Sequence, residues 1–292
     1  MILVCGLMVF GAFWYRSNPL TPAAMLKRMP ARESVVLYID MAQLRHMDLT
    51  DRFFNNAKVG QDPEYQAFIQ KIDFNFRTDL DSAMLAIAPN GKYVLARGRF
   101  DWPALNNFVN SQGGHCNNAV CNLVGSAPER RISFFPLQKG LMALAVSPEE
   151  GSADRLNLVD QRINIELPKS PIWLMIPQSV LQARTDLPPG TKMFAEKMER
   201  AEQAMIWLGG TKEQFSAKMD VRCANISDAV AMASNLAQVT HLLKRLIESE
   251  GKIPNPADLS GFLTSGTFHN EGNHVIGEWP IQQALIETLF GG

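Results

Sequence analysis

The sequence predicts an α+β protein with two similar halves, mostly antiparallel sheets with helices on one face, and one N-terminal transmembrane helix. Three observations predict this class. Residues 1–15 contain no charged side chain. The rest of the chain carries strand, hairpin and helix patterns in the same order twice. Consecutive hairpin patterns are typical of antiparallel sheets, and the intervening helical patterns indicate helices packed on those sheets.

The apolar segment at residues 1–15 is short for a membrane span. A helix of that length reaches about 22 Å, whereas a hydrocarbon core of about 30 Å usually takes about 20 residues. The segment is therefore a signal-peptide hydrophobic region, a short anchor, or an anchor that starts upstream of residue 1. An ordinary buried N-terminal helix is the alternative to all three.

The residues that flank this segment favour an anchor that is not cleaved. A cleaved signal peptide needs a basic region and a small-x-small site, yet no Lys or Arg precedes Arg16. Trp14 and Tyr15 next to Arg16 resemble an interfacial aromatic belt. We therefore expect a transmembrane anchor at residues 1–16. The residues expected to contact the membrane are Phe10, Phe13, Trp14, Tyr15 and Arg16.

Two features give opposite indications of orientation. Lys27, Arg28 and Arg32 follow the segment, and the positive-inside rule places such residues in the cytoplasm. Cys116 and Cys121 lie in a loop rich in Gly and Asn and suit a small disulfide loop, which persists in oxidising compartments. We favour a single-pass protein of the bacterial inner membrane with its C-terminal body in the periplasm.

Composition indicates a globular body without a nucleic-acid partner. The chain is 46% hydrophobic and 20% charged, which fits a body with a real core. Its net charge is -1, so it lacks the basic footprint of a nucleic-acid-binding protein. The expected divisions are an anchor at 1–16, a linker at 17–32, a first half at 33–150, a linker at 151–169 and a second half at 170–292.

The first half begins with a β-branched run at 34–40, followed by a helical pattern at 41–49. Strand patterns at 81–88 and 92–100 flank Asn90-Gly91, a strong hairpin indication. Asp101 is the expected N-cap of a helix at 102–110, which ends at Gly113-Gly114. Strand patterns at 131–136 and 141–147 close this half.

The second half repeats this order. A strand pattern at 171–177 precedes a helical pattern at 178–183, and strand patterns at 204–208 and 213–223 flank Gly209-Gly210. Asn225 or Ser227 is the expected cap of a long helix that extends to about Glu250 and ends at Gly251. Strand patterns at 261–269 and 274–279 close the half.

The long helix has an apolar stripe, with members at intervals of three or four residues. Its most direct interpretation is packing against a sheet, and the alternative is a groove for a partner. The stripe consists of Val230, Ala233, Leu236, Thr240, Leu243 and Ile247.

Cys116 and Cys121 are five positions apart. A disulfide is the favoured interpretation, with unpaired thiols and a metal site as alternatives. With His115 they would supply three metal ligands, and a structural zinc site needs a fourth. Cys223 is isolated in the sequence. We therefore expect no metal and no cofactor.

The remaining polar residues are weak candidates for a functional site. His269 and His274 flank a turn-forming segment between two strand patterns, so they need no metal. Asp79 and Asp81 are close enough in sequence for acid–base catalysis, but their position at a turn that leads into a strand pattern explains them better. Four arginines are candidate contacts to an acidic partner or to lipid headgroups. They are Arg97, Arg99, Arg130 and Arg131.

No catalytic residue is assigned. The Walker A, dinucleotide-binding and nucleophile-elbow patterns are absent from the sequence. This lowers the expectation of an enzyme without removing it.

Several segments resemble an uncharacterised family of bacterial membrane-anchored proteins. They are residues 97–102 (RGRFDW), 114–121 (GHCNNAVC), 131–137 (RISFFPL), 141–147 (LMALAVS), 255–261 (NPADLSG) and 277–281 (GEWPI). The resemblance spans most of the body and carries no known activity. It implies an anchor with an extracytoplasmic body.

The expected function is a non-catalytic accessory or scaffold subunit of a larger membrane complex. The apolar anchor and the missing catalytic motifs lead to this expectation. The partners would be integral membrane subunits and membrane lipid, and an energy-transducing respiratory or photosynthetic complex is a plausible host. The alternatives are a module that binds a lipid or a small apolar molecule between the halves, and an unrecognised hydrolase.

Overall fold

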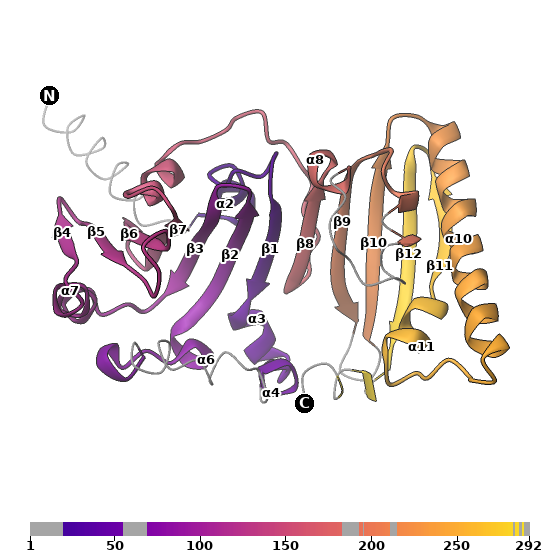
Figure 1. The fold of residues 1–292 in the computed structure, drawn as a ribbon, viewed down its shortest axis with the longest axis horizontal. Coiled ribbons are helices and arrows are strands. Elements are labelled where there is room, and N and C mark those ends of the chain that lie inside the picture. The colour runs from indigo at the N-terminus through magenta and orange to yellow at the C-terminus, as the bar shows by residue number, and fades with distance from the viewer. Residues whose placement is uncertain are drawn as a thin grey trace, which may run out of the picture. The chain divides into compact units, whose positions relative to one another are not determined.

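The computed structural model describes residues 20–54, 69–182, 193–194, 196–210, 215–282, 284–285 and 288 (Figure 1). These residues form two compact units. Unit 1 takes residues 20–31 and 69–167, and unit 2 takes residues 32–54 and those from 168 onward. The predicted anchor at 1–16, with Phe10, Phe13, Trp14, Tyr15 and Arg16, lies outside the described residues.

Unit 1 is an antiparallel sheet with helices. Its helices are α2 (Pro22–Leu26), α6 (Phe76–Asp79), α7 (Trp102–Ser111) and the 3-10 helix η2 (Ser152–Asn157). Its strands are β2 (Leu80–Ala88), β3 (Gly91–Gly98), β4 (His115–Asn117), β5 (Val120–Val124), β6 (Arg131–Gln138) and β7 (Leu141–Ser147). They lie in the order β2-β3-β7-β6-β5-β4, and each neighbouring pair is antiparallel.

Unit 2 is also an antiparallel sheet with helices. Its helices are α3 (Met41–His46), α4 (Thr50–Phe54), α8 (Gln178–Leu181), α10 (Ile226–Ser249) and α11 (Leu259–Thr264). Its strands are β1 (Val35–Asp40), β8 (Ile172–Pro177), β9 (Ala201–Gly210), β10 (Phe215–Cys223), β11 (Thr267–Glu271) and β12 (His274–Ile281). They lie in the order β1-β8-β9-β10-β12-β11, and each neighbouring pair is antiparallel.

The predicted α+β class with antiparallel sheets is therefore confirmed. Asp101 caps α7, because its side chain accepts a hydrogen bond from the Ala104 backbone N–H at 3.0 Å. Asn225, rather than Ser227, caps α10, and it accepts from the Asp228 N–H at 2.9 Å. The hairpin turns at 89–90 and 272–273 also lie where they were predicted.

The placement of helices on one face only is wrong for unit 1. Ser133 and Phe134 are neighbours on β6, so their side chains point to opposite faces of the sheet. Phe134 packs in the core beneath α7, whereas the Ser133 hydroxyl accepts a hydrogen bond from the Ala153 N–H of η2 at 2.9 Å. Helices therefore cover both faces of this sheet.

The segment 261–269, predicted as one strand, is a helix followed by a strand. Asp258 caps α11 by accepting from the Ser260 N–H at 2.7 Å. A side chain on Gly261 would collide with the Asn255 carbonyl, so glycine is needed at this close approach.

Two helices that were predicted as such, at 41–49 and 178–183, are shorter than expected. They end at His46 in α3 and at Leu181 in α8, and the last predicted position, 183, lies outside the described residues.

Strand β1 pairs with β8 and belongs to unit 2, although the sequence grouped residues 33–150 as one half. The two units nevertheless share an order of strands. In unit 1 the closing hairpin β6–β7 joins β3 through β7. In unit 2 the closing hairpin β11–β12 joins β10 through β12.

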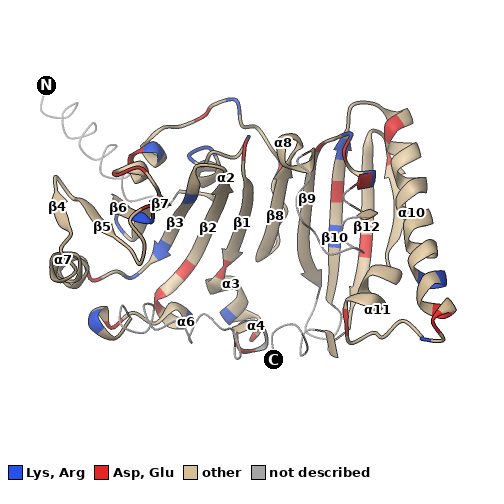
Figure 2. Ribbon diagram, viewed as in Figure 1, with Lys and Arg blue, Asp and Glu red and all other residues tan. Residues whose placement is uncertain are grey.

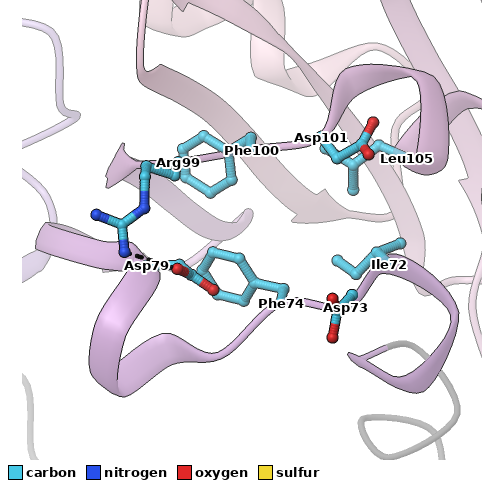
Figure 3. A pocket seen from close by; sticks show the side chains of 8 residues that line it. All are labelled: Ile72, Asp73, Phe74, Asp79, Arg99, Phe100, Asp101 and Leu105. Atoms are coloured by element: carbon cyan, nitrogen blue, oxygen red, sulfur yellow. Dashed lines mark hydrogen bonds and ion pairs between the residues drawn. The ribbon is translucent and has the colours of Figure 1, made fainter.

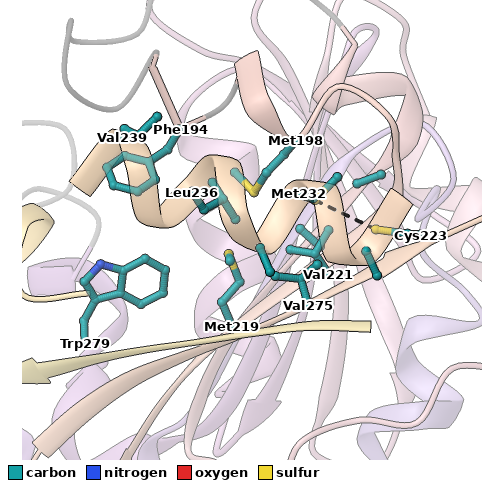
Figure 4. Packing of buried hydrophobic residues seen from close by; sticks show 14 of the residues in the cluster. Phe194, Met198, Met219, Val221, Cys223, Met232, Leu236, Val239, Val275 and Trp279 are labelled. Carbon is teal, nitrogen blue, oxygen red and sulfur yellow. Dashed lines mark hydrogen bonds between the residues drawn. The ribbon is translucent and has the colours of Figure 1, made fainter. Parts of the chain in front are cut away.

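The core of unit 2 lies between α10 and strands β10 and β12 (Figure 4). Leu236 and Met232 point from α10 toward Met219, Val221 and Val275 on the sheet. All of these side chains are buried. Among the described helices, none combines the length and the apolar content that a membrane crossing requires.

Candidate functional site

The solvent side of α10 carries an exposed row of residues at every fourth position. Because each step of four residues turns about 40° around the helix axis, the row forms a ridge that winds obliquely around the helix. Its aliphatic members are 40 to 60% exposed, and its two central members are polar and exposed. The row, called the α10 ridge below, consists of Ile226, Val230, Ser234, Gln238, Leu242 and Leu246.

The charges of α10 lie near its ends. No Asp, Glu, Lys or Arg occurs between residues 229 and 243. Asp228 lies in the first turn, and Lys244, Arg245 and Glu248 lie in the last turns. Figure 2 shows the middle of the helix without a charged residue. The exposed residues of this middle part include the polar but uncharged Ser234, Gln238 and His241.

Further apolar side chains lie close to the C-terminal end of α10. Ile253 is 86% exposed in the segment after the helix, and Leu259 is 48% exposed at the start of α11. Helices α10 and α11 contact one another. The exposed apolar surface of unit 2 therefore extends beyond the ridge at this end.

The face of the sheet that α10 covers is apolar across its whole width. One row of laterally paired residues contains Trp279, Ala217, Leu208, Ile172 and Ile39. The next row contains Gly277, Met219, Ile206, Leu174 and Leu37. No charged residue occurs in either row.

Helix α10 packs on only part of this face, over β10, β11 and β12. The members on β10 and β12 are accordingly buried, with Met219 2% and Trp279 7% exposed. On β8 and β1, Ile172, Leu174 and Leu37 are only half-buried. This second apolar surface is called the β1–β8 face below.

The opposite face of unit 2 is polar over β10 and β12. Lys218 Nζ lies 3.8 Å from Glu278 Oε1, and Arg222 Nε lies 3.0 Å from Glu202 Oε2. His274 Nδ1 lies 2.6 Å from Asp220 Oδ1. These exposed cross-strand pairs contribute little to stability individually, and they indicate an ordinary solvated sheet face.

A cavity of about 470 Å³ lies in unit 1 (Figure 3). Phe74 and Phe100 form a stacked pair at one side of it, with ring centroids 5.6 Å apart. Its lining residues include no Ser, Thr, Cys or His. They are Ile72, Asp73, Phe74, Asp79, Arg99, Phe100, Asp101 and Leu105.

The polar groups of this cavity already serve the fold. Asp79 Oδ1 accepts from Arg99 at 2.8 Å, and Asp79 Oδ2 accepts from the Asn75 N–H at 2.8 Å. These contacts, the Asn75 hydrogen bond first, lower the pKa of the Asp79 carboxyl. Asp101 caps α7. The arrangement offers no nucleophile beside a base, so it does not support the hydrolase alternative.

Cys116 and Cys121 form a disulfide, with Sγ atoms 2.10 Å apart. They are direct cross-strand partners in the hairpin of β4 and β5. Asn118 and Ala119 form the turn of this hairpin with positive φ angles of 50° and 69°, as a two-residue type I′ turn requires. The sequence predicted the disulfide and missed the two short strands.

A smaller cavity of about 100 Å³ lies beside this hairpin. Glu150 contacts His115 Nε2 at 3.4 Å and Arg131 at 3.0 Å through its two carboxylate oxygens. All three side chains are substantially exposed. The lining residues include no Ser, Thr or Cys, so the His–Glu pair has no nucleophile to activate.

The structure does not gather the four candidate arginines. Arg97 donates to the Leu20 carbonyl at 2.5 Å, and Arg130 donates to the Ser126 hydroxyl at 3.2 Å. Arg97 lies opposite one end of β7, and Arg131 lies opposite the other end. Arg99 is held by Asp79. Each arginine thus has a partner within unit 1.

The histidines that flank the last hairpin turn point to different acids. His269 Nε2 lies 3.1 Å from Glu271, and His274 contacts Asp220. Within the described parts of the chain, no group of three or more His, Cys, Asp or Glu side chains could hold a metal ion. Cys223 is buried, and burial raises the pKa of its thiol.

The sequence pattern indicated the buried side of α10 but not its exposed side. Leu236, Ala233 and Thr240 are buried as their spacing predicts. Val230, placed in the same stripe, is 49% exposed. The α10 ridge was detectable in principle, because Ile226 and Val230, and again Leu242 and Leu246, are aliphatic pairs with a spacing of four.

No known family model matches the chain, and no curated protein matches it. The solved structure of TP0453 in crystal form I is similar to it, with a TM-score of 0.51 and 14% sequence identity. The match covers 94% of this chain and 98% of that chain. Crystal form IV of TP0453 gives a TM-score of 0.47 at 13% identity, and it covers 97% of this chain and 100% of that chain. At this level of identity the similarity describes the fold alone.

Proposed function

We propose that this protein is a non-catalytic accessory subunit of a membrane assembly and that it acts by binding other protein surfaces. The observation that carries this proposal is the α10 ridge. Its four aliphatic residues are each 40 to 60% exposed on α10, and exposed apolar surface marks interaction sites. The apolar segment at residues 1–15 supports a position at a membrane.

The location that fits this role is the bacterial inner membrane, with the body in the periplasm. The disulfide between Cys116 and Cys121 supports an oxidising compartment. In this proposal residues 1–16 anchor the chain beside integral membrane subunits, and unit 2 binds a protein surface through α10.

Co-migration of the tagged full-length chain tests the proposal. The chain is purified in mild detergent from its native membranes and run on a native gel. We expect it to migrate in a complex with other subunits. The variant Val230→Glu/Leu246→Glu places charges on two ridge residues that are each 49% exposed, and we expect it to leave the complex.

The matched control is Val124→Glu/Leu158→Glu. These residues are aliphatic, are 55% and 70% exposed, and lie in unit 1. The control adds the same charge and should stay in the complex. A wild-type chain that migrates alone would contradict the proposal, as would equal behaviour of the two variants.

A second candidate function is the binding of a lipid or a small apolar molecule. The β1–β8 face favours it, because Ile172, Leu174 and Leu37 form apolar surface that α10 does not cover. Native mass spectrometry of the protein from its own membranes should then detect a stoichiometric apolar ligand. Leu37→Asn/Leu174→Asn should lose it, whereas Lys218→Gln on the opposite face should retain it. A protein that carries no such molecule contradicts this candidate.

A further inference from the structure

The larger cavity of unit 1 lies between two segments of chain, residues 72–79 and 99–105 (Figure 3). The segments are joined at one end of the cavity. The Arg99 guanidinium donates to Asp79 Oδ1 at 2.8 Å and to the Thr78 carbonyl at 2.7 Å. The Arg99 backbone N–H also donates to the Asp79 carbonyl at 2.8 Å. One cation and one carboxylate are therefore paired at this end.

The walls of the cavity are apolar and well supported. Ile72 and Leu105 are 8% and 2% exposed and belong to the core of unit 1. Phe74 and Phe100 pack against that core and are stacked on one another, and Phe100 also contacts the ring of Trp102 at a centroid distance of 6.0 Å. The cavity volume of about 470 Å³ falls within the range of small-molecule sites, which is about 300–1,000 Å³.

The other end of the cavity carries two carboxylates that the fold leaves without a counter-charge. Figure 3 places Asp101 beside Leu105 and Asp73 beside Ile72, one aspartate on each segment. Asp101 uses its Oδ1 atom to accept from the Ala104 N–H at 3.0 Å. Asp73 is the exception among the polar groups of the cavity, because its side chain has no hydrogen bond or ion pair within the described parts of the chain. The described lining residues include three aspartates and one arginine, so they carry a net charge of -2.

We propose that this cavity binds a primary amine that carries an apolar body. The ammonium group lies at the end that holds Asp73 and Asp101, and the apolar body lies against the two phenyl rings. An ammonium group has three N–H donors, so it can serve both carboxylates. An anion would meet net negative charge, because Arg99 is already paired. A neutral apolar molecule would leave the two carboxylates without a counter-charge.

The exposure of the two carboxylates predicts weak binding. Asp73 and Asp101 are both exposed, and ion pairs in contact with water are worth little. We therefore expect a dissociation constant on the order of 1 mM. Salt screens such pairs, so the affinity should fall as the ionic strength is raised.

Isothermal titration calorimetry of the full-length chain in an uncharged detergent tests the site, with a blank titration into the same detergent. Benzylamine is the probe, because it joins an ammonium group to one aromatic ring. We expect saturable binding at one site per chain. Methylamine has no apolar body and benzyl alcohol has no charge, so each should bind at least fivefold more weakly. The absence of saturable benzylamine binding up to about 10 mM overturns the proposal, as does equal binding of the three probes.

The variant Asp73→Asn/Asp101→Asn removes both charges and retains the local backbone. Asn caps helices as well as Asp does, and it tolerates the positive φ of 51° at residue 73. We expect this variant to bind benzylamine at least fivefold more weakly and to bind benzyl alcohol as the wild-type chain does. The matched control is Asp154→Asn, which removes an exposed charge from η2 outside the lining of the cavity. It should bind both probes like the wild-type chain.

The two probes separate the loss of charge from the loss of structure. An equal loss of both probes in Asp73→Asn/Asp101→Asn would show that the aspartates support the cavity rather than a ligand cation, and it overturns the proposal. An unchanged benzylamine affinity in this variant also overturns it, as does an equal loss in Asp154→Asn. The site belongs to unit 1, so its failure would leave the proposed role of α10 unaffected.

Discussion

Asp79 stabilises the junction between α6 and β2 through its charge. Its carboxylate accepts hydrogen bonds from the Asn75 backbone and from Arg99, which lies just beyond β3. The pKa of this carboxyl is lowered from its usual 3.8 in the folded state. A group with a lowered folded pKa stabilises the protein above its unfolded pKa, and that contribution is lost as the pH falls through the folded pKa.

Asp79→Asn should therefore reduce the acid sensitivity of the protein. Above about pH 4 the wild-type protein should be more stable than the variant, and the difference should shrink as the pH falls below that value. Denaturant unfolding at a series of pH values measures this difference. Between pH 6 and 8 the carboxyl is ionised in both states, so the two curves should be parallel there. A constant difference down to pH 2 contradicts the assignment.

Gly266 allows Trp279 to enter the core of unit 2. A Cβ atom at this position would collide with Trp279 Nε1. The indole ring is otherwise enclosed by Phe262 and Phe268, with ring centroids 5.8 and 5.1 Å away. The ring therefore has little room to move, and its Nε1 is one of two buried side-chain polar atoms without a hydrogen-bond partner among the described residues.

Gly266→Ala should destabilise the protein by about 1–3 kcal/mol, the usual cost of overpacking a core. Urea denaturation followed by tryptophan fluorescence measures the change. Gly209→Ala is the control, because the nearest atom to its added Cβ is 3.9 Å away. This control should be neutral or slightly stabilising. Equal stabilities of the two variants would show that Trp279 tolerates the added methyl group.

Local roles of single residues were predictable, and contacts across the fold were not. Asp101 and Asn225 were recognised as caps because a cap depends on the two or three residues that follow it. The Asp79–Arg99 pair joins residues that meet only because β2 and β3 are aligned in one register. For the same reason the sequence could name Arg97 and Arg99 as candidate contacts to a partner but could not predict their bonds to Leu20 and Asp79.

At the scale of elements, the hairpin of β4 and β5 depends on its disulfide. Strand β4 has three residues and pairs only with β5 in the described sheet of unit 1. A strand this short at the edge of a sheet has few hydrogen bonds to hold it. The disulfide limits the unfolded chain, and closing a loop of this size contributes about 2 kcal/mol in the chain-entropy model.

Reduction of Cys116–Cys121 should lower the free energy of unfolding by about 2 kcal/mol. Denaturant unfolding with and without a phosphine reductant measures this effect. The variant Cys116→Ser/Cys121→Ser should show the lower stability in both conditions and should not respond to the reductant. Identical wild-type curves in the two conditions would contradict a stabilising disulfide.

The elements that were missed or misassigned are short. Their local sequences do not distinguish helix from strand, and their conformation depends on surrounding contacts. Residues 261–264 read as an apolar strand, but the cap at Asp258 and the close approach at Gly261 make them helical. The three-residue β4 exists because Cys116 and Cys121 face one another. Long elements such as α10 were predicted within two residues because their periodicity extends over many turns.

At the scale of the molecule, unit 2 is built from two separate stretches of chain. Strand β1 completes one side of its sheet by pairing with β8. Strand β8 is almost wholly apolar (IWLMIP), and its Trp173 and Met175 are each 1% exposed. Without β1, β8 would become an unprotected apolar edge, which favours aggregation.

A fragment with residues 168–292 alone should therefore be largely insoluble. Residues 32–54 joined to 168–292 through a flexible Gly/Ser linker should restore solubility, because β1 then covers β8. Size-exclusion chromatography and the soluble fraction after expression measure the difference. As a control, the joined segment carries Val36→Pro, which removes a backbone donor from β1 at a residue that is 0% exposed. Equal solubility of all three fragments contradicts this role of β1.

The pairing of β1 with β8 also affects how the protein is made. Val36 pairs with Met175, so the ribosome adds about 140 residues between the two partners. At about 5–20 residues per second this takes roughly 7 to 28 seconds. During that time β1 is complete, but β8 has not been synthesised. The apolar residues of β1 must therefore be protected by other means. The nascent chain is thus expected to need a chaperone in this interval, and slower translation would prolong the need.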